Sequence, residues 1–330
     1  MDNSVVIAVD AMGGDFAPDV VLRGITQALD ADAQLSVIVC GPQDVVVPFC
    51  AHHTRLQAEC CSEVITMAEH PALAVRKKKD SSLVRACRLV KEGKAAGVYS
   101  AGSTGACLTA AIMHMGRIKG IARPALCVTL PTKKNPVLLC DVGANADCKA
   151  AYLEQFAHMA MAYCSATLNV EHPRVALLNI GEEREKGSQF AQDVHALLEQ
   201  RIEGFQGNIE GRDLLSGKVD VVVCDGFTGN VALKTLEGTA AFLMDEMRET
   251  FLSSITTKLA ALLIKDQFKA MKARLNPDTY GGAPLLGVEG VCMIGHGSSR
   301  ERAICNGILT CARATRGKLV ESIRRSIGAE

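Results

Sequence analysis

The chain has 330 residues, 48% hydrophobic and only 4% aromatic, so its core must be built from aliphatic and small side chains. Its 36 basic residues balance 36 acidic ones, which argues against bulk binding of nucleic acid. No apolar run approaches the roughly 18 residues of a transmembrane helix and no signal peptide opens the sequence, so we expect a cytoplasmic protein whose 14 cysteines are reduced.

Short β-branched runs alternate with segments of helical periodicity along most of the chain. This alternation predicts a Rossmann-like, three-layer α/β/α fold whose mainly parallel sheet is covered on both faces. Because no linker, repeat or low-complexity tract interrupts the pattern, residues 1–330 are predicted to form a single domain. The predicted strands are 5–9, 35–39, 98–100, 126–130, 137–140, 175–179, 219–224 and 291–294, and the clearest helices are 80–92, 105–115, 150–168 and 188–202.

Glycine-bearing turns with polar side chains follow six of the predicted strands. Ligands bind outside the carboxyl ends of strands in open α/β sheets, so we expect the six turns to lie along one edge. The turn Gly102-Ser103-Thr104-Gly105 is the strongest anion candidate, because a helix start offers unpaired N–H groups and this one adds two hydroxyls. Taken alone, such a turn is more often an ordinary N-cap, and the other glycine turns expected at the same edge favour a binding site.

Four carboxylates also follow strands, namely Asp10, Asp15, Asp141 and Asp225. Carboxylates in such positions orient ligands, bind a divalent ion or act as bases, and they also cap helices, so both interpretations stay open. Lys186 lies in a glycine-flanked turn, where a mobile cation can neutralise phosphate or a developing oxyanion. A lone lysine is more often simply solvated.

Other kinds of site have weaker support. Ser103, Asp225 and His296 follow the chain order of an α/β-hydrolase triad, but the first glycine of the nucleophile elbow and a second oxyanion motif are missing. A cluster of Cys and His at 50–61 has neither a C-x-x-C pair nor H-E-x-x-H spacing, so no metal site is predicted. No G-x-G-x-x-G follows the early strands, which argues against a nicotinamide site.

Two segments carry local positive charge. The run Arg76-Lys77-Lys78-Lys79 is either a solvated face or a surface that steers an acidic partner. Residues 239–275 show no strand signal, only a long helical stretch. Its part 251–275 has five basic residues against one acidic residue, with apolar side chains at helical spacing. Such a stretch packs on the sheet, pairs with its copy in a dimer, or lies on a membrane surface.

Nine motifs in chain order carry a resemblance to a known family. They are DAMGGD at 10–15, RKKKDSS at 76–82, SAGSTG at 100–105, RPAL at 123–126, DVGAN at 141–145, NIGEE at 179–183 with KG at 186–187, DGFTGN at 225–230, YGGAPLLG at 280–287 and HG at 296–297. One such motif is weak, whereas nine in order are specific, and the resemblance runs essentially from residue 5 to residue 326. The sequence resembles the bacterial PlsX-type phosphate acyltransferases (phosphate:acyl-carrier-protein acyltransferases).

The resemblance implies transfer of an acyl group from acyl carrier protein (ACP) to inorganic phosphate, giving acyl phosphate for phospholipid synthesis. It also implies a fold like that of phosphotransacetylases and of isocitrate or isopropylmalate dehydrogenases. A homodimer with peripheral membrane attachment, and no cofactor or metal, is typical of the family. No nucleic acid is expected as a partner.

On this basis we expect phosphate to attack the thioester directly, without an acyl-enzyme. Lys186 would offset negative charge, and Asp225 would orient Lys186 or manage the proton of the departing thiol. The alternatives are a serine hydrolase or thioesterase that uses Ser103, Asp225 and His296, and a non-catalytic, membrane-docked scaffold that binds ACP. The predicted catalytic residues are Lys186, Asp225, Asn230 and His296, and the predicted phosphate- and substrate-binding residues are Asp10, Gly13, Gly14, Asp15, Gly102, Ser103, Thr104, Gly105, Asp141 and Asn145.

Overall fold

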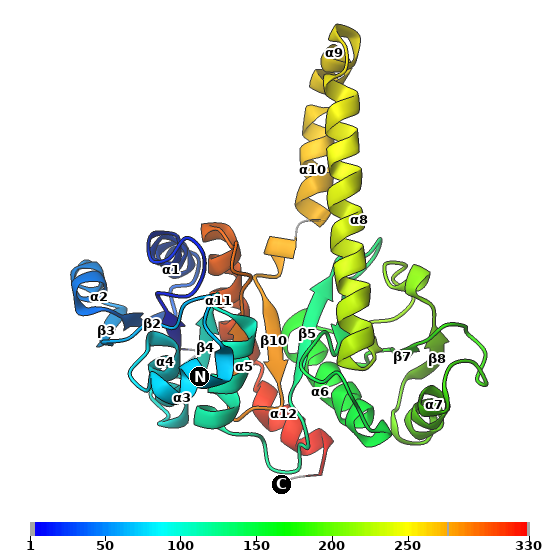
Figure 1. Cartoon of the computed structure of the whole chain (residues 1–330), viewed down its shortest axis with the longest axis horizontal. Helices are drawn as coiled ribbons and strands as arrows, with labels where there is room; N and C mark the ends of the chain where they lie inside the picture. Colours follow the sequence, from blue (N-terminus) through cyan, green and yellow to red (C-terminus); the bar gives the residue numbers. More distant parts are fainter. Residues whose placement is uncertain (1–3, 276, 329–330) are drawn as a thin grey trace.

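The computed structural model describes residues 4–275 and 277–328, without the side chains of residues 270, 272–275 and 277. Within these residues, eleven strands form one continuous sheet (Figure 1). Across the sheet, the strands are β3 (Leu56–Cys60), β2 (Leu35–Gly41), β1 (Val5–Asp10), β4 (Gly97–Ser100), β11 (Val291–Ile294), β10 (Ala283–Leu286), β5 (Ala125–Leu130), β6 (Val137–Cys140), β9 (Val221–Val223), β7 (Val175–Leu178) and β8 (Phe205–Ile209).

The strand directions divide the sheet into two halves of opposite polarity. β3, β2, β1, β4 and β11 run parallel to one another, and β6, β9, β7 and β8 form a second parallel group. Between them, β10 is antiparallel to both β11 and β5, and β5 is antiparallel to β6. The carboxyl ends of the two groups therefore point to opposite edges. The expectation that all six glycine-bearing turns share one edge is wrong, because the central antiparallel strands reverse the direction.

Helices cover both faces of the sheet, which confirms the predicted three-layer α/β/α fold. One face packs against α1 (Asp19–Ala31), α2 (Gln43–Cys50), α6 (Ala150–Leu168), α7 (Gln189–Arg201), α11 (Glu301–Arg316) and α12 (Leu319–Ser326). The other face packs against α3 (Pro71–Lys77), α4 (Ser82–Lys91), α5 (Thr104–Ala110) with its π-helical continuation η1 (Ala111–Met115), and the start of α8 (Gly226–Leu252).

The cysteines belong to these aliphatic cores. All 14 are free, and most are buried. Burial raises the pKa of Cys40, Cys87 and Cys292 well above its ordinary value, so these thiols stay protonated and pack as small apolar side chains.

The sequence pattern located most elements and missed three strands. All eight predicted strands and all four predicted helices are present, within two residues at each end. β3 and β8 were missed; they are the two edge strands, and their half-exposed residues lack a continuous apolar run. β10 was missed although it is central, because Pro284 and the flanking glycines argue against a central strand.

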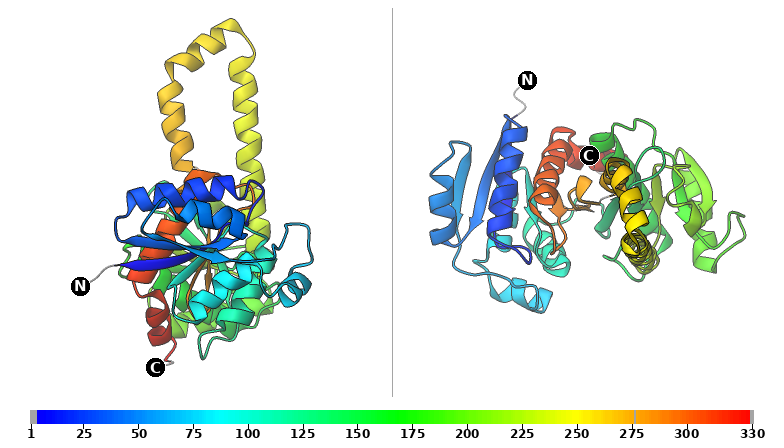
Figure 2. Two further views of the ribbon diagram at one scale, coloured as in Figure 1. Left: turned by 90° about the vertical axis from the view of Figure 1, so that its left-hand side faces the viewer. Right: turned by 90° about the horizontal axis from the view of Figure 1, so that it is seen from above.

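Residues beyond the foot of α8 leave the body as a helical arm (Figures 1 and 2). α8 rises from the sheet, α9 (Ile255–Leu263) forms the tip, and α10 (Lys265–Leu275) returns toward the body. The rings of Phe251 and Phe268, edge to face at 5.6 Å, join α8 to α10. None of the described helices is long and apolar enough to span a membrane.

Residues 239–275 are helical in the arm, and they do not pack on the sheet. Its apolar side chains project into solvent, since Ile255 is 80% exposed and Leu263 82% exposed. The dimer and membrane alternatives stay open. The side chains of Lys272, Arg274 and Leu275, which belong to the basic and apolar pattern, lie outside the described residues.

Candidate active site

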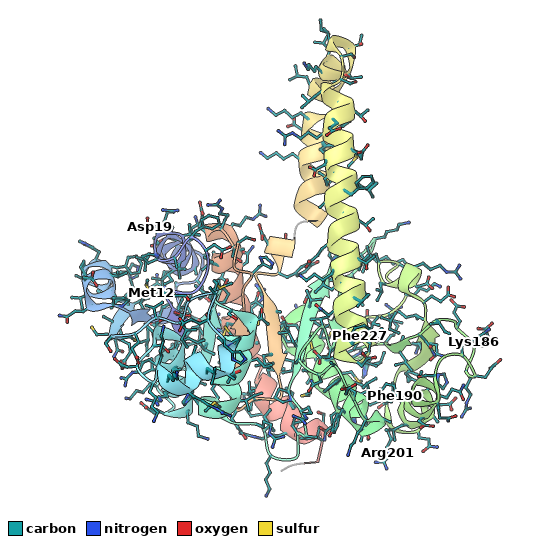
Figure 3. All side chains as sticks on the ribbon, in the orientation of Figure 1. Met12, Asp19, Lys186, Phe190, Arg201 and Phe227 are labelled. Carbon is teal, nitrogen blue, oxygen red and sulfur yellow. The ribbon has the colours of Figure 1, made fainter. Side chains whose placement is uncertain are left out.

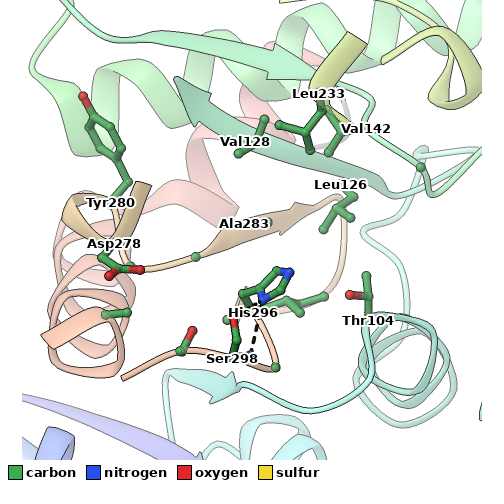
Figure 4. Close-up of a pocket in the computed structure, with 18 of the residues that line it drawn as sticks. Thr104, Leu126, Val128, Val142, Leu233, Asp278, Tyr280, Ala283, His296 and Ser298 are labelled. Atoms are coloured by element: carbon green, nitrogen blue, oxygen red, sulfur yellow. Dashed lines mark hydrogen bonds between the residues drawn. The ribbon is translucent and has the colours of Figure 1, made fainter. Parts of the chain in front are cut away.

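A pocket of about 640 Å³ lies on the face of the sheet that carries α5 and α8 (Figure 4). On this face α5 covers one half of the sheet and the foot of α8 covers the other, while β5, β10 and β11 line the pocket between them. Strands of four residues are only about 13 Å long, so turns from opposite edges both reach this space. Asp15, Gly102 and His296 come from one edge, and Gly143 comes from the other.

Asp10 organises the first set of turns from beneath the pocket. It is buried, and it accepts hydrogen bonds from Ser100 Oγ at 2.7 Å and from Met12 N–H at 3.1 Å. Ser100 Oγ in turn accepts the N–H of Gly102 at 3.1 Å. Burial raises the pKa of the Asp10 carboxyl in spite of these bonds. A Cβ on Gly13 would lie 2.7 Å from the Gly102 nitrogen, so glycine is needed where the two turns meet.

The start of α5 presents hydrogen-bonding groups to the pocket. Ser103 occupies the N-cap position, but its side chain makes no capping hydrogen bond. Thr104 is exposed and lines the pocket. Because the helix continues through η1 to Met115, its dipole places partial positive charge at this end. The ordinary N-cap interpretation therefore does not describe Ser103, and the first turn of α5 can receive an anion.

His296 follows β11 and is exposed within the pocket (Figure 4). Its Nδ1 accepts the Ser298 N–H at 3.3 Å and lies 2.8 Å from Ser298 Oγ. Because Nδ1 accepts a backbone N–H, the neutral ring carries its proton on Nε2, which can donate to an oxyanion. The N–H of Asp15 donates to the carbonyl of Gly297 at 2.8 Å, which ties the turn after β11 to the turn after β1.

Asp141 shapes the turn that reaches the pocket from the other edge. Its buried carboxylate accepts the N–H groups of Leu126, Gly143, Ala144 and Asn145 at 2.8–3.2 Å, and also the Asn145 side-chain amide at 2.9 Å. Burial raises the pKa of Asp141, while these bonds favour its ionised form. The carboxylate is used by the turn itself, and it is Gly143 that lines the pocket.

Asp225 caps α8 at the same edge. Its oxygens accept the N–H of Thr228 at 2.8 Å and the Thr228 hydroxyl at 2.7 Å, so the capping interpretation describes it. Gly229 lets the helix touch the neighbouring turn, because a Cβ there would lie 1.9 Å from the Asp141 carbonyl oxygen. Asp225 and Gly229 together fix the height and direction of the helix foot.

One face of α8 supplies three side chains to the pocket. Asn230, Leu233 and Lys234 all line it, as their i, i+3 and i+4 spacing on a helix allows. Among the described residues that line the pocket, Lys234 is the only lysine or arginine. Its Nζ bonds Glu237 at 2.7 Å, but both side chains are about half exposed. Such a pair contributes less than about 1 kcal/mol, so Lys234 can exchange it for an anionic ligand.

The pocket has an apolar side as well. Figure 4 shows Leu126, Val128, Val142 and Leu233 together, across from His296. One side of the pocket thus suits a hydrocarbon chain, and the other suits an anion. Within the part of the chain that the structure describes, no three His, Cys, Asp or Glu side chains gather as metal ligands.

Comparison with known proteins agrees with this geometry. Residues 5–321 match the family model described as "Fatty acid synthesis protein". The chain is 44% identical over 308 residues to the phosphate acyltransferase of Dictyoglomus turgidum, covering 92% of this chain and 91% of the relative. It is 42% identical over 325 residues to the phosphate acyltransferase of Clostridium tetani, covering 97% of each. The chain belongs to the phosphate acyltransferase family.

Solved structures similar to this chain share its fold. The EutD phosphotransacetylase of Staphylococcus aureus has a TM-score of 0.59 at 16% identity, over 96% of this chain and 95% of that one. The 4-hydroxythreonine-4-phosphate dehydrogenase of Klebsiella pneumoniae has a TM-score of 0.55 at 15% identity, over 95% and 98%. At such identities the similarity establishes the fold alone, and it confirms the predicted likeness to phosphotransacetylases.

The structure brings together part of the predicted site. The pocket is lined by Asp15, Gly102, Thr104, Asn230 and His296. Gly14, Ser103 and Gly105 lie in the same turns without lining it, and Asp10, Gly13, Asp141, Asn145 and Asp225 take part in the contacts within the turns. The catalytic or binding role of each residue stays a prediction.

Lys186 lies apart from this pocket. It is exposed in the loop between β7 and α7 and is not among the pocket residues. Figure 3 labels it at the outer end of the molecule, beyond the foot of α8. Nor does the geometry support a hydrolase triad. Among the described residues, no hydrogen bond joins Ser103, Asp225 and His296, since Asp225 is bonded to Thr228 and His296 to Ser298.

Sequence reasoning missed several pocket residues. Lys234 follows Asn230 by four positions on the same helix, so helical spacing was a signal that could have found it. Tyr280 and Asp278 come from the segment between the arm and β10, where no strand was predicted. Leu126 and Val128 lay within a predicted strand, but their exposure to a pocket depends on which helices cover them.

Proposed function

We propose that this pocket transfers a fatty acyl group from ACP to inorganic phosphate, giving acyl phosphate for phospholipid synthesis. Membership of the phosphate acyltransferase family supports acyl transfer to phosphate, and ACP as the acyl donor is our proposal. The observation that carries it is the division of one pocket into a polar side at His296 and Thr104 and an apolar side at Leu126, Val128 and Leu233. A phosphate and an acyl thioester need such neighbouring surfaces.

The reaction forms one bond and breaks one. An oxygen of HPO₄²⁻ attacks the thioester carbonyl carbon, a C–O bond forms, and the C–S bond breaks as the tetrahedral oxyanion collapses. The products are acyl phosphate and the free carrier thiol, and the phosphate proton ends on the thiol sulfur. Because phosphate is already a nucleophile, the protein contributes mainly positioning and charge stabilisation.

Phosphate is proposed to bind between the first turn of α5 and His296. The Thr104 hydroxyl and the helical N–H groups of that turn donate to it, with Ser103 beside them. His296 Nε2 then donates either to phosphate or to the oxyanion that develops on the thioester. Asp10 and Asp141 act indirectly by holding the turns in place, as their buried hydrogen bonds support.

Two lysines are candidates for the positive charge that this chemistry needs. Lys234 lies in the pocket and has only a solvated ion pair to give up. Lys186 is exposed in a glycine-flanked loop and acts on the same phosphate only if that loop closes over the pocket. We therefore assign the main charge to Lys234 and keep Lys186 as the second candidate. Asn230 is proposed to polarise the thioester carbonyl, and Asp225 to hold the helix that carries Asn230 and Lys234.

The arm is proposed to attach this cytoplasmic enzyme to the membrane surface and to contribute to a homodimer. At its tip, Leu259 and Leu262 are 60% and 69% exposed, and Lys258 lies beside them. Exposed leucines next to basic side chains suit the interface of an anionic lipid membrane. Farther down the arm, the exposed Phe242 and Leu243 are available to a second copy of the chain.

Release of free thiol from long-chain acyl-ACP, measured with and without phosphate, tests the proposed activity. We expect release only with phosphate, formation of acyl phosphate, and no acyl adduct when the enzyme is examined by mass spectrometry. An acyl group on Ser103 together with thiol release in the absence of phosphate would establish the thioesterase instead. Binding of acyl-ACP without any thiol release would establish the non-catalytic scaffold.

A further inference from the structure

Residues 71–94 concentrate positive charge in a chain that is neutral overall. This segment, which covers α3 and α4, holds eight basic residues and two acidic residues. The rest of the chain is therefore net acidic. Two of its basic groups pair with carboxylates outside the segment, Lys78 with Glu69 and Arg85 with Glu59. The remaining excess creates a positive potential that acts over roughly a Debye length, about 8 Å at physiological salt.

Within the basic run at 76–79, Lys78 has a structural role. Its ammonium group bonds Glu69 Oε1 and the carbonyl oxygen of Val64, each at 2.7 Å. The Glu69 carboxylate also accepts the N–H of Thr66 at 2.8 Å, and these bonds lower the pKa of Glu69. Lys78 thereby holds the segment before α3, which carries Met67 into the lining of the pocket.

The other three basic residues of the run face solvent. Arg76, Lys77 and Lys79 are exposed, and in the part of the chain that the structure describes no carboxylate lies within ion-pair distance of them. Exposed apolar side chains accompany them, because Leu73 is 51% exposed and Met67 is 45% exposed. Unpaired positive charge beside exposed apolar side chains is typical of a surface that binds an acidic protein.

Helix α3, which carries two of these basic side chains, begins beside the pocket. A Cβ on Gly105 would lie 2.9 Å from the ring of Pro71, so the start of α3 packs directly against the start of α5. Thr104 of α5 and Met67 both line the pocket. A partner bound to α3 would thus stand next to the place where the acyl thioester reacts.

We infer that Met67, Leu73, Arg76, Lys77 and Lys79, here called the α3 surface, form the docking site for an acidic carrier protein that delivers the acyl thioester. This inference rests on the proposed function, since it names where the donor binds. A membrane fits this surface less well. In both Figures 1 and 2, α3 lies on the body of the molecule, well away from α9 at the tip of the arm, and the leucines of α9 are exposed.

The test compares two donors of the same long-chain acyl group, acyl-ACP and acyl-pantetheine, which has no carrier protein. In the double variant Arg76→Glu, Lys77→Glu, we expect KM for acyl-ACP to rise by about tenfold or more with kcat little changed. Turnover of acyl-pantetheine should stay at the wild-type rate. Raising the salt concentration should raise the wild-type KM for acyl-ACP and affect the variant much less.

Two further variants control for charge and folding. Arg23→Glu with Arg325→Glu makes the same charge change on α1 and α12, which cover the other face of the sheet, and should leave both donors unaffected. Because Arg76 and Lys77 lie in the last turn of α3, where basic groups favour the helix, the melting temperature is measured as well. Lys79→Glu, outside the helix, should shift KM in the same direction by a smaller factor.

Specific outcomes would overturn the docking site. An unchanged KM for acyl-ACP in the double variant, or an equal loss with both donors, rules it out. A loss of binding to anionic phospholipid vesicles with an unchanged KM would assign the α3 surface to the membrane instead. If the wild-type enzyme used acyl-pantetheine and phosphate but never acyl-ACP, the carrier part of the proposed function would fail, and docking would fail with it.

Discussion

At the scale of single residues, mutation can decide which lysine supplies the positive charge that stabilises the reacting phosphate. Lys234→Ala should lower phosphate-dependent kcat by about 100-fold, because removal of one group that stabilises charge in the transition state typically costs a few kcal/mol. Lys186→Ala, assayed beside it, should lose less. Glu237→Gln removes the ion-pair partner of Lys234 but leaves the lysine charged. This variant should therefore turn over at close to the wild-type rate. A large loss at Lys186 with little loss at Lys234 would show that the loop closes instead.

The same scale shows where sequence reasoning stopped. The strand-end carboxylates were visible in the sequence, but whether each faces a ligand or serves the backbone depends on where other N–H groups lie. Asp141 accepts the N–H of Leu126, fifteen residues away, and Asp10 accepts the hydroxyl of Ser100, ninety residues away. Asp225 accepts the N–H of Thr228, three residues on, so its capping role could be predicted from the local sequence. Local bonding could be predicted, and bonding across the sheet could not.

At the scale of elements, the close contact between Gly229 of α8 and the turn at Asp141 positions the side of the pocket that α8 lines. Gly229→Ala places a methyl carbon 1.9 Å from the Asp141 carbonyl oxygen, a backbone atom that cannot move aside cheaply. We expect destabilisation of about 1–3 kcal/mol and a higher KM for phosphate, both measurable by denaturant unfolding and kinetics. Gly238→Ala is the matched control, because its Cβ meets nothing within 4 Å on the same helix. That variant should gain up to about 1 kcal/mol from helix propensity; equal losses in both variants would contradict the packing argument.

Elements that are continuous in sequence were the ones that sequence could predict. The periodicity of α6 over Ala150–Leu168 and the apolar run of β6 are local signals. β10 has no such signal, because Pro284 lacks an N–H and glycines flank the strand. Yet β10 lies between β11 and β5, where the sheet changes direction. The strand that decides how the two halves of the sheet meet therefore had the weakest signal in the sequence.

At the scale of the whole molecule, the reversal in the sheet explains why the site is a pocket on a face and not a crevice along an edge. If all strands were parallel, the turns after β4 and β6 would share one edge. With β10 and β5 antiparallel, these turns come from opposite edges and meet over short strands, with α5 on one side and α8 on the other. The sequence predicted the turns and their chemistry, whereas their meeting place followed from pairing between distant strands.

The tip of the arm is the proposed membrane contact, and its role can be tested separately from that of the pocket. Leu259→Glu with Leu262→Glu should abolish flotation with anionic phospholipid vesicles, because burial of each leucine contributes about 1.5–3 kcal/mol. Turnover in solution should remain, since α9 lies at the far end of the arm (Figure 2), away from the strands and the start of α8 that line the pocket. Leu243→Glu, on the shaft of α8, is the control for added charge away from the tip, and it should float like the wild type even if the dimer contact proposed there is lost. Light scattering on the same samples separates the alternatives. If the tip variant still floats but becomes monomeric, the tip is a dimer contact and the membrane assignment fails.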